Sequence, residues 1–175
     1  MKQHHVFSFL QRMGKSFMLP IAVLPVAGIF LGVGSSLTNE TTIAALHLES
    51  VLGQGTFLYS VLILLKQVGK VLFDNLPLIF AVSIALGMSK RRKEVAALAA
   101  IIAFFVMHAT INTLLCLDGS IVNGVVSNYI LDGSITSVCG MLSLEMGVFG
   151  GIVVGLGVSY LHNHFYQIQL PNVIS

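Results

Sequence analysis

Long apolar stretches dominate the pattern of hydrophobic and polar positions along this chain. A helix needs about 20 mainly apolar residues to cross a hydrocarbon core of about 30 Å. Four stretches reach that length or come close to it, and they predict membrane-spanning helices at residues 17–37, 71–88, 95–117 and 142–161. The pattern therefore predicts an all-α integral membrane protein.

A shorter apolar run lies before the second predicted span. Phe57–Leu65 is too short to cross a membrane, and Lys66 and Lys70 follow it. Lysine stems can lie along apolar surface while their charges reach water, so we expect a short interfacial helix here. In the first span, Pro20 and Pro25 each remove a backbone donor, so that helix should kink or break.

The overall composition supports a lipid environment. Apolar residues make up 55% of the chain and charged residues only 9%, whereas about 25% charged is ordinary for a soluble domain. A chain this poor in charge could not cover a soluble surface, so the lipid bilayer is its expected partner. No nucleic-acid partner and no cofactor are expected.

The placement of charge predicts an orientation in the membrane. All Lys and Arg residues lie in the first 93 positions, and four of them form the turn Lys90–Lys93. Residues 38–56 and 118–141 contain none. Because positive residues stay on the cytoplasmic side, both termini and the basic turn should be cytoplasmic. The first apolar run is too long for a cleaved signal peptide, which is the disfavoured alternative.

Two predicted spans carry small residues at helical spacing. Glycines four apart let two helix backbones approach closely, so we expect these residues to pack helices together. The residues are Gly28 and Gly32 in the first span, and Gly147, Gly151 and Gly155 in the fourth.

Four polar residues within or beside the spans are candidates for a substrate path. They are Asp74, Asn75, His108 and Asn112. Polar residues at membrane depth usually face the bundle interior and often line a pathway, although a simple interhelical hydrogen bond is the common alternative. His108 and Asn112 are four apart and should share a helix face. Asp74 and Asn75 come just before Leu76-Pro77, where the helix should be interrupted.

The chain shows no catalytic arrangement, P-loop or GxGxxG motif. Cys116 and Cys139 lack CxxC spacing, so we expect either inert apolar thiols or, if both face an oxidising side, a disulfide. His162 and His164 are two apart and point in different directions on a helix, so a solvated helix end is expected rather than a metal site. We therefore expect no metal ion and no catalytic residue in this chain.

Three ordered segments resemble a known family. The first begins with Gly14 and Lys15 and includes Pro20, the second begins with Leu76-Pro77, and the third runs from the glycines of the fourth span to Leu170-Pro171. Together they resemble the enzyme IIC sugar permeases of the phosphotransferase system, in the glucose, maltose and N-acetylglucosamine branch. Residues 115–142 match poorly, and His164 stands where the family commonly has Arg.

The resemblance implies that transport and phosphorylation are divided among several protein parts, of which this chain is one. Residues 1–175 would be the N-terminal part of a IIC domain, which forms the scaffold and the homodimer interface. The C-terminal IIC half would bind the sugar, and a IIB component would carry a phosphorylated cysteine. A IIA component and a bacterial inner membrane are also implied. Neither cysteine here lies in a IIB-like context. The chain should therefore be inactive alone, as the membrane component of a transferase system. The alternative is a stand-alone scaffold or regulatory module that associates with a complete permease.

Overall fold

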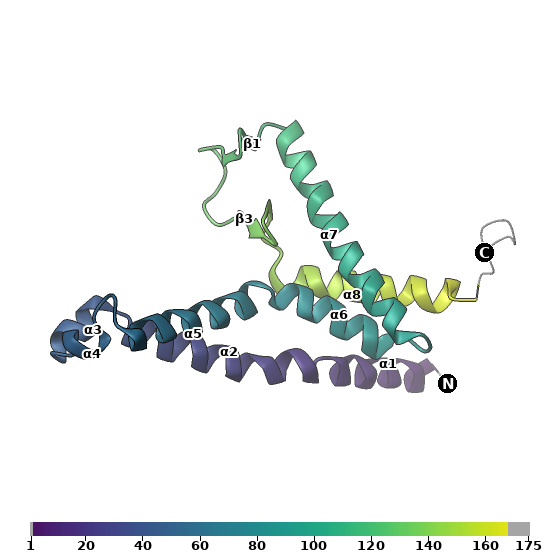
Figure 1. The fold of residues 1–175 in the computed structure, drawn as a ribbon. Coiled ribbons are helices and arrows are strands. Elements are labelled where there is room, and N and C mark those ends of the chain that lie inside the picture. The colour runs from purple at the N-terminus through teal and green to yellow at the C-terminus, as the bar shows by residue number, and fades with distance from the viewer. Residues whose placement is uncertain (1, 168–175) are drawn as a thin grey trace, which may run out of the picture. The chain divides into compact units, whose positions relative to one another are not determined.

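A computed structural model describes residues 2–167, with side chains from Phe7 onward. The chain is mainly helical (Figure 1). Its elements in chain order are α1 (Lys2–Ser16), α2 (Met18–Leu37), α3 (Glu40–Ala45), α4 (Glu49–Leu52), α5 (Phe57–Asp74), α6 (Leu76–Met88), α7 (Lys93–Leu117), β1 (Ile121–Val122), β2 (Val125–Val126), β3 (Ile135–Val138), β4 (Met141–Leu144) and α8 (Gly147–Phe165). They form two compact units, unit 1 with residues 2–18 and 76–167 and unit 2 with residues 19–75. The family segment at Leu170-Pro171 lies outside the described residues.

Two described segments are long and apolar enough to cross a membrane. They are Phe7–Leu37 and Lys93–Leu117, and the broken pair of α5 and α6 makes a third if it counts as one span. The helix α8 is not among them, because its last turn carries His162, Asn163 and His164. The structure thus supports a helical membrane protein with two or three candidate spans.

The region around the second predicted span differs from the prediction. The expected short helix at residues 57–65 is instead the beginning of α5, which continues through Lys66 and Lys70 to Asp74. The charges interrupt the apolar run but not the helix, since lysine is a good helix former. The interruption expected just before Leu76-Pro77 is observed, because α5 ends at Asp74 and α6 begins at Leu76, so residues 71–88 are not one continuous helix. Pro77 explains the break, since it cannot donate to the preceding turn and its ring clashes there.

Unit 2 is a helical unit with its own small core. Ile43, Leu52 and Leu62 are buried together and join the short helices α3 and α4 to α5. The first span was expected to kink or break, and α2 continues without a break through Pro25 to Leu37. A kink at Pro25 stays a prediction. Pro20 lies in the first turn of α2, where the backbone N–H has no helical partner in any case.

Glycines bring two helices together in unit 2, but at positions other than those expected. A Cβ on Gly69 of α5 would lie 2.5 Å from the backbone nitrogen of Leu31 in α2, and a Cβ on Gly34 would lie 2.6 Å from Lys66. A Cβ on Gly28 or Gly32 would meet nothing within 4 Å. The face with Gly28 and Gly32 is therefore open within unit 2.

Unit 1 is built around α6, which packs along α8 and also against α7 and α1. The helix α6 is apolar on all sides, as expected for a helix surrounded by others. Phe80, Ile84 and Met88 form one buried cluster, and Ala85, Ala96 and Ala100 form another. Ser16 and Ser83 also meet, because the Ser83 hydroxyl donates a hydrogen bond to the Ser16 carbonyl.

The α6–α8 contact is a close approach of two backbones. A Cβ on Gly151 would collide with the carbonyl oxygen of Pro77, and a Cβ on Gly155 would lie 2.7 Å from the carbonyl oxygen of Ala81. Gly147 is not part of this face, since it begins α8 with a φ of +51° and meets only the Glu145 carboxylate at 3.7 Å. Glycine is therefore needed at 151 and 155 for space and at 147 for backbone conformation.

The segment between α7 and α8 corrects the all-α prediction. β1 pairs with β2 and β3 pairs with β4, each as a short antiparallel hairpin. The fourth predicted span therefore starts too early, because Met141–Leu144 is a strand and α8 begins only at Gly147. Cys139 and Gly140 connect β3 to β4, and both have positive φ, at 50° and 84°. Positive φ at both central residues is the conformation of a tight hairpin turn.

Candidate functional site

Asp74 and Asn75 complete the end of α5. Asp74 forms an ion pair with Lys70 at 2.5 Å, and both side chains are about half exposed. The Asn75 side-chain amide donates to the Val71 carbonyl at 2.8 Å, one turn earlier. An exposed pair four residues apart contributes little to stability, about 0.3–0.5 kcal/mol. In unit 2 these two residues therefore serve the local geometry of the helix terminus.

His108 and Asn112 lie one turn apart on α7, and both reach the β3–β4 hairpin. The Nδ1 atom of His108 lies 2.7 Å from the hydroxyl of Ser143. The Asn112 amide donates to the Leu142 carbonyl at 2.6 Å. His108 and Ser143 are almost fully buried, with 2% and 0% exposure. Their shared face thus attaches the hairpin to α7.

Glu145 secures the other side of the same hairpin and was not a predicted site residue. One carboxylate oxygen accepts the Gly147 backbone N–H at 3.0 Å, at the first turn of α8. The other accepts the hydroxyl of Thr136 on β3. A carboxylate is favourable at a helix N-terminus because the N–H groups there are unpaired and carry partial positive charge. The sequence signal for this helix-capping role is an acidic residue two positions before the glycine-rich apolar run that begins at Gly147.

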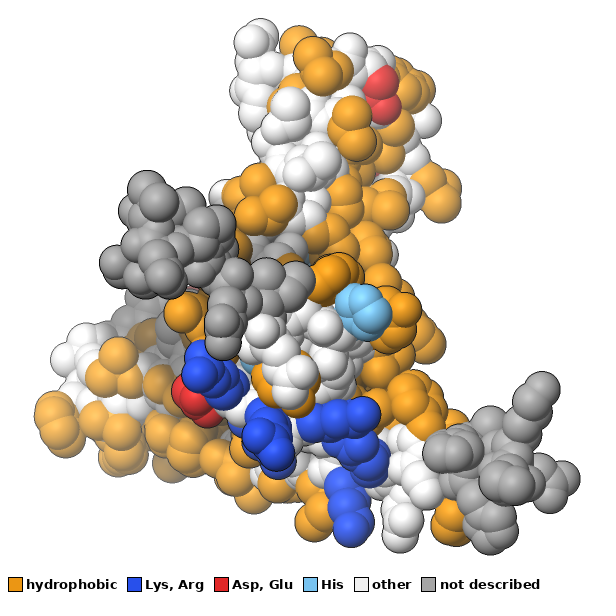
Figure 2. Space-filling view, turned by 90° about the vertical axis from the view of Figure 1, so that its right-hand side faces the viewer, with side chains coloured by type: hydrophobic (Ala, Val, Ile, Leu, Met, Phe, Trp, Pro, Cys, Tyr) orange, Lys and Arg blue, Asp and Glu red, His pale blue; other side chains and the backbone are white. Residues whose placement is uncertain are grey.

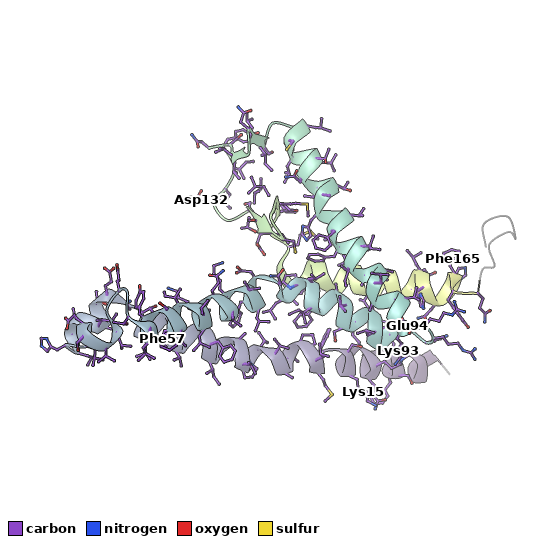
Figure 3. All side chains as sticks on the ribbon, in the orientation of Figure 1. Lys15, Phe57, Lys93, Glu94, Asp132 and Phe165 are labelled. Carbon is purple, nitrogen blue, oxygen red and sulfur yellow. The ribbon has the colours of Figure 1, made fainter. Side chains whose placement is uncertain are left out.

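A basic surface marks the opposite end of α7 from the hairpins. Figure 2 shows Lys and Arg side chains gathered on one face. The turn Lys90–Lys93 and Arg12 are exposed. Figure 3 shows Lys93 and Glu94 at one end of α7, with Asp132 away from that end in the segment that carries the hairpins. The β3–β4 hairpin contacts α7 at His108 and Asn112, more than halfway along the helix from Lys93.

Polar side chains from α1 and α8 hold the basic turn in place. The Arg12 guanidinium and the Asn163 amide both donate to the Met88 carbonyl, each at 3.0 Å. The Lys90 backbone N–H donates to the side-chain oxygen of Asn163 at 2.8 Å. His162 contributes as well, since its Nε2 atom lies 2.8 Å from the Arg91 carbonyl. Three helices thus meet at the end of α6.

The histidines and cysteines take local roles. His162 faces the turn, whereas His164 stacks on Tyr160 with ring centroids 6.5 Å apart. Among the described residues, no group of three His, Cys, Asp or Glu side chains could hold a metal ion. Cys116 and Cys139 are not joined by a disulfide within the described part of the chain. Burial raises the pKa of the Cys139 thiol, so the reactive thiolate is disfavoured there.

Asp118 shapes the exit from α7. The pKa of its carboxyl is lowered by hydrogen bonds from Ser120, first from the side chain and then from the backbone. The backbone N–H of Ser120 donates to the Asp118 carboxylate at 2.8 Å. This short local loop stabilises the charged carboxylate as the chain turns into β1.

Three of the predicted path residues have partners within their own unit. Asp74 is paired at the surface, and His108 and Asn112 are used by the hairpin. Recognition of a sugar would need several convergent polar groups around one cavity.

Comparisons with known proteins give a consistent result. A family model described as "Phosphotransferase system, EIIC" matches residues 14–175. The glucose-specific EIICBA component of the PTS system of Staphylococcus saprophyticus subsp. saprophyticus is 37% identical over 169 residues. The similarity covers 97% of this chain and 23% of that protein.

Proposed function

Because the chain belongs to the EIIC family of the phosphotransferase system, we propose that it forms the N-terminal scaffold of a phosphoenolpyruvate-dependent permease for a glucose- or maltose-type sugar. The observation that carries this proposal is the similarity to a glucose-specific relative along 97% of the chain. The similarity to a transport component does not favour a stand-alone regulatory module. Residues 1–175 are thus assigned to the membrane portion of a sugar permease.

The packing of unit 1 supports the proposal that residues 1–175 act as a rigid scaffold. Alternating access requires one rigid body to move against another around a bound substrate. The helices α6 and α8 approach so closely at Gly151 and Gly155 that side chains cannot intervene. Such a contact suits a body that does not rearrange. The groups that bind the sugar would then come from the C-terminal IIC half that the family resemblance implies.

Further partners follow from the name of the relative, which joins EIIC with B and A components. We extend the proposal to IIB and IIA functions that phosphorylate the transported sugar, either fused to this chain or separate from it. A homodimer is also proposed, as the family resemblance implies. The open face with Gly28 and Gly32 supports it, since small residues four apart permit a second helix to approach.

The proposed orientation places the basic turn Lys90–Lys93 and both termini in the cytoplasm. Translocating clustered Lys and Arg is unfavourable, and residues 94–175 contain neither. In this arrangement α2, the broken pair of α5 and α6, α7 and α8 each cross once. The hairpins at residues 121–144 then lie outside.

A reporter that is active only outside the cytoplasm tests this orientation. Alkaline phosphatase fused after Ser175 is expected to be inactive, because four crossings return the chain to the cytoplasm. The matched control is the same enzyme inserted after Asp132, in the segment between β2 and β3, where it should be active. High activity after Ser175, or an inactive insertion at Asp132 in a stably inserted protein, would contradict the proposed topology.

Transport by the isolated residues tests the scaffold role. In a strain that lacks other glucose and maltose permeases, residues 1–175 alone should give sugar uptake and phosphorylation at the empty-vector level. The physical reason is that phosphoryl transfer needs a suitable nucleophile, and neither cysteine lies in a IIB-like context. A complete permease in the same strain is the positive control. Uptake by residues 1–175 above the vector level would show that this portion is itself a transport unit.

A further inference from the structure

A groove at the basic end of unit 1 combines two kinds of wall. It has a volume of about 520 Å³ and lies between α1, the end of α6 and α8. Arg12, Lys90 and His164 contribute its polar wall. Phe9, Leu156 and Tyr160 contribute its apolar wall. None of the described residues that line it is acidic, so the groove suits a ligand with an anionic group and a hydrocarbon part.

The polar end of this groove is held in shape by the protein itself. The Met88 carbonyl accepts hydrogen bonds from both Arg12 and Asn163, which fixes α1 and α8 to the end of α6. The Lys90 backbone N–H is bound to Asn163, so the start of the basic turn is also fixed. The structure gives the Lys90 ammonium no hydrogen bond within the described residues. Its charge is thus free to meet a ligand.

The surroundings of the groove have the character of a membrane–water boundary. Phe9 is 44% exposed and Tyr160 is 72% exposed, in helices that continue into apolar segments. Lys90, at the start of the exposed turn Lys90–Lys93, lines the same groove. Aromatic side chains and the ends of lysine and arginine side chains gather at the level of lipid headgroups. Basic pockets between membrane helices are also suited to anionic headgroups.

We propose that this groove binds an anionic phospholipid. Its phosphate lies against Arg12 and Lys90, and one acyl chain lies along Phe9, Leu156 and Tyr160. A free phosphate would satisfy the cations but would leave the apolar wall uncovered. A phospholipid matches both walls, because its charged and hydrocarbon parts are adjacent. Bound there, the lipid would bridge α1 and α8 across the end of α6.

The test compares two lipids with the same acyl chains on the purified chain in neutral detergent. Bound lipid is counted by native mass spectrometry during titration with dioleoyl phosphatidylglycerol or with dioleoyl phosphatidylcholine. Phosphatidylglycerol should bind more tightly. Lys90→Gln should weaken its binding about fivefold, as expected for one lysine near an anionic lipid. Lys90 is exposed and uses only its backbone N–H within the fold, so the variant should keep its thermal stability.

The matched control is Lys93→Gln, which removes the same charge a few residues away, outside the groove. It should leave phosphatidylglycerol binding unchanged. Equal losses in Lys90→Gln and Lys93→Gln would show a diffuse surface effect and overturn the proposal. Equal affinity for the two lipids would also overturn it. So would displacement of phosphatidylglycerol by inorganic phosphate at similar concentration, which would identify a site for free anions.

Discussion

Replacing Gly151 by Ala is expected to destabilise the protein more than the same change at any exposed glycine of α8. The added Cβ would collide with the carbonyl oxygen of Pro77 and lie 2.8 Å from its carbonyl carbon. These are backbone atoms in the first turn of α6, so they cannot rotate away as a side chain could. Overpacking of a dense core costs about 1–3 kcal/mol, and a backbone collision should reach the upper end of that range.

The matched control for this prediction is Gly157→Ala. Gly157 lies on the same helix, and a Cβ there would meet nothing within 4 Å. Both changes gain the better helix propensity of alanine, about 0.8–1.0 kcal/mol, so the difference between them isolates the collision. Thermal unfolding in detergent, followed by circular dichroism, measures it. Equal melting temperatures for the two variants would mean that α6 and α8 do not approach as described.

Replacing His108 by Phe should detach the β3–β4 hairpin from α7. The new ring keeps most of the volume beside Phe104, which now contacts the imidazole with ring centroids 4.5 Å apart. It removes the partner of the Ser143 hydroxyl, which is fully buried. A buried polar group left without a partner costs about 1–3 kcal/mol. Hydrogen exchange at residues 135–144 should therefore become faster.

Two further variants separate this bond from general damage to α7. Adding Ser143→Ala to His108→Phe should restore part of the lost protection, because no unpaired hydroxyl remains. Thr113→Val should have little effect, since Thr113 is exposed and its hydroxyl donates only to the Ala109 carbonyl of its own helix. If His108→Phe left hydrogen exchange in the hairpin unchanged, the His108–Ser143 contact would not hold it.

Long apolar runs explain why much of the helical structure could be predicted. α2 and α7 begin within two residues of the predicted spans at 17–37 and 95–117. The predicted span at 142–161 was wrong at its start, because an apolar run there is compatible with either a helix or a strand. Met141–Leu144 is as apolar as the helix that follows, and only the turn at Cys139 and Gly140 indicates a hairpin. Local turn conformation is a weaker sequence signal than hydrophobicity.

The candidate site shows a similar limit. The spacing of His108 and Asn112 correctly indicated a common face, because it depends only on helix periodicity. Their partners could not be predicted, since Ser143 and Leu142 lie 30 or more residues away along the chain, at the end of the poorly matching segment or just beyond it. Gly151 lies at the helix contact whereas Gly147 does not, because α8 begins at Gly147. Helix periodicity identifies faces, but tertiary structure decides what covers them.

Sugar uptake by a chimeric permease tests the central claim most directly. Residues 14–175 of this chain, which match the family model, replace the corresponding segment of the glucose-specific EIICBA relative. That relative is 37% identical to this chain over 169 residues. The host strain lacks other glucose permeases, and membrane insertion is verified with an antibody against the EIIA part. The scaffold account predicts phosphoenolpyruvate-dependent glucose uptake by this chimera, and uptake lost when Gly151→Ala is added. A stably inserted chimera that takes up no glucose would contradict the assignment of this chain to a permease scaffold.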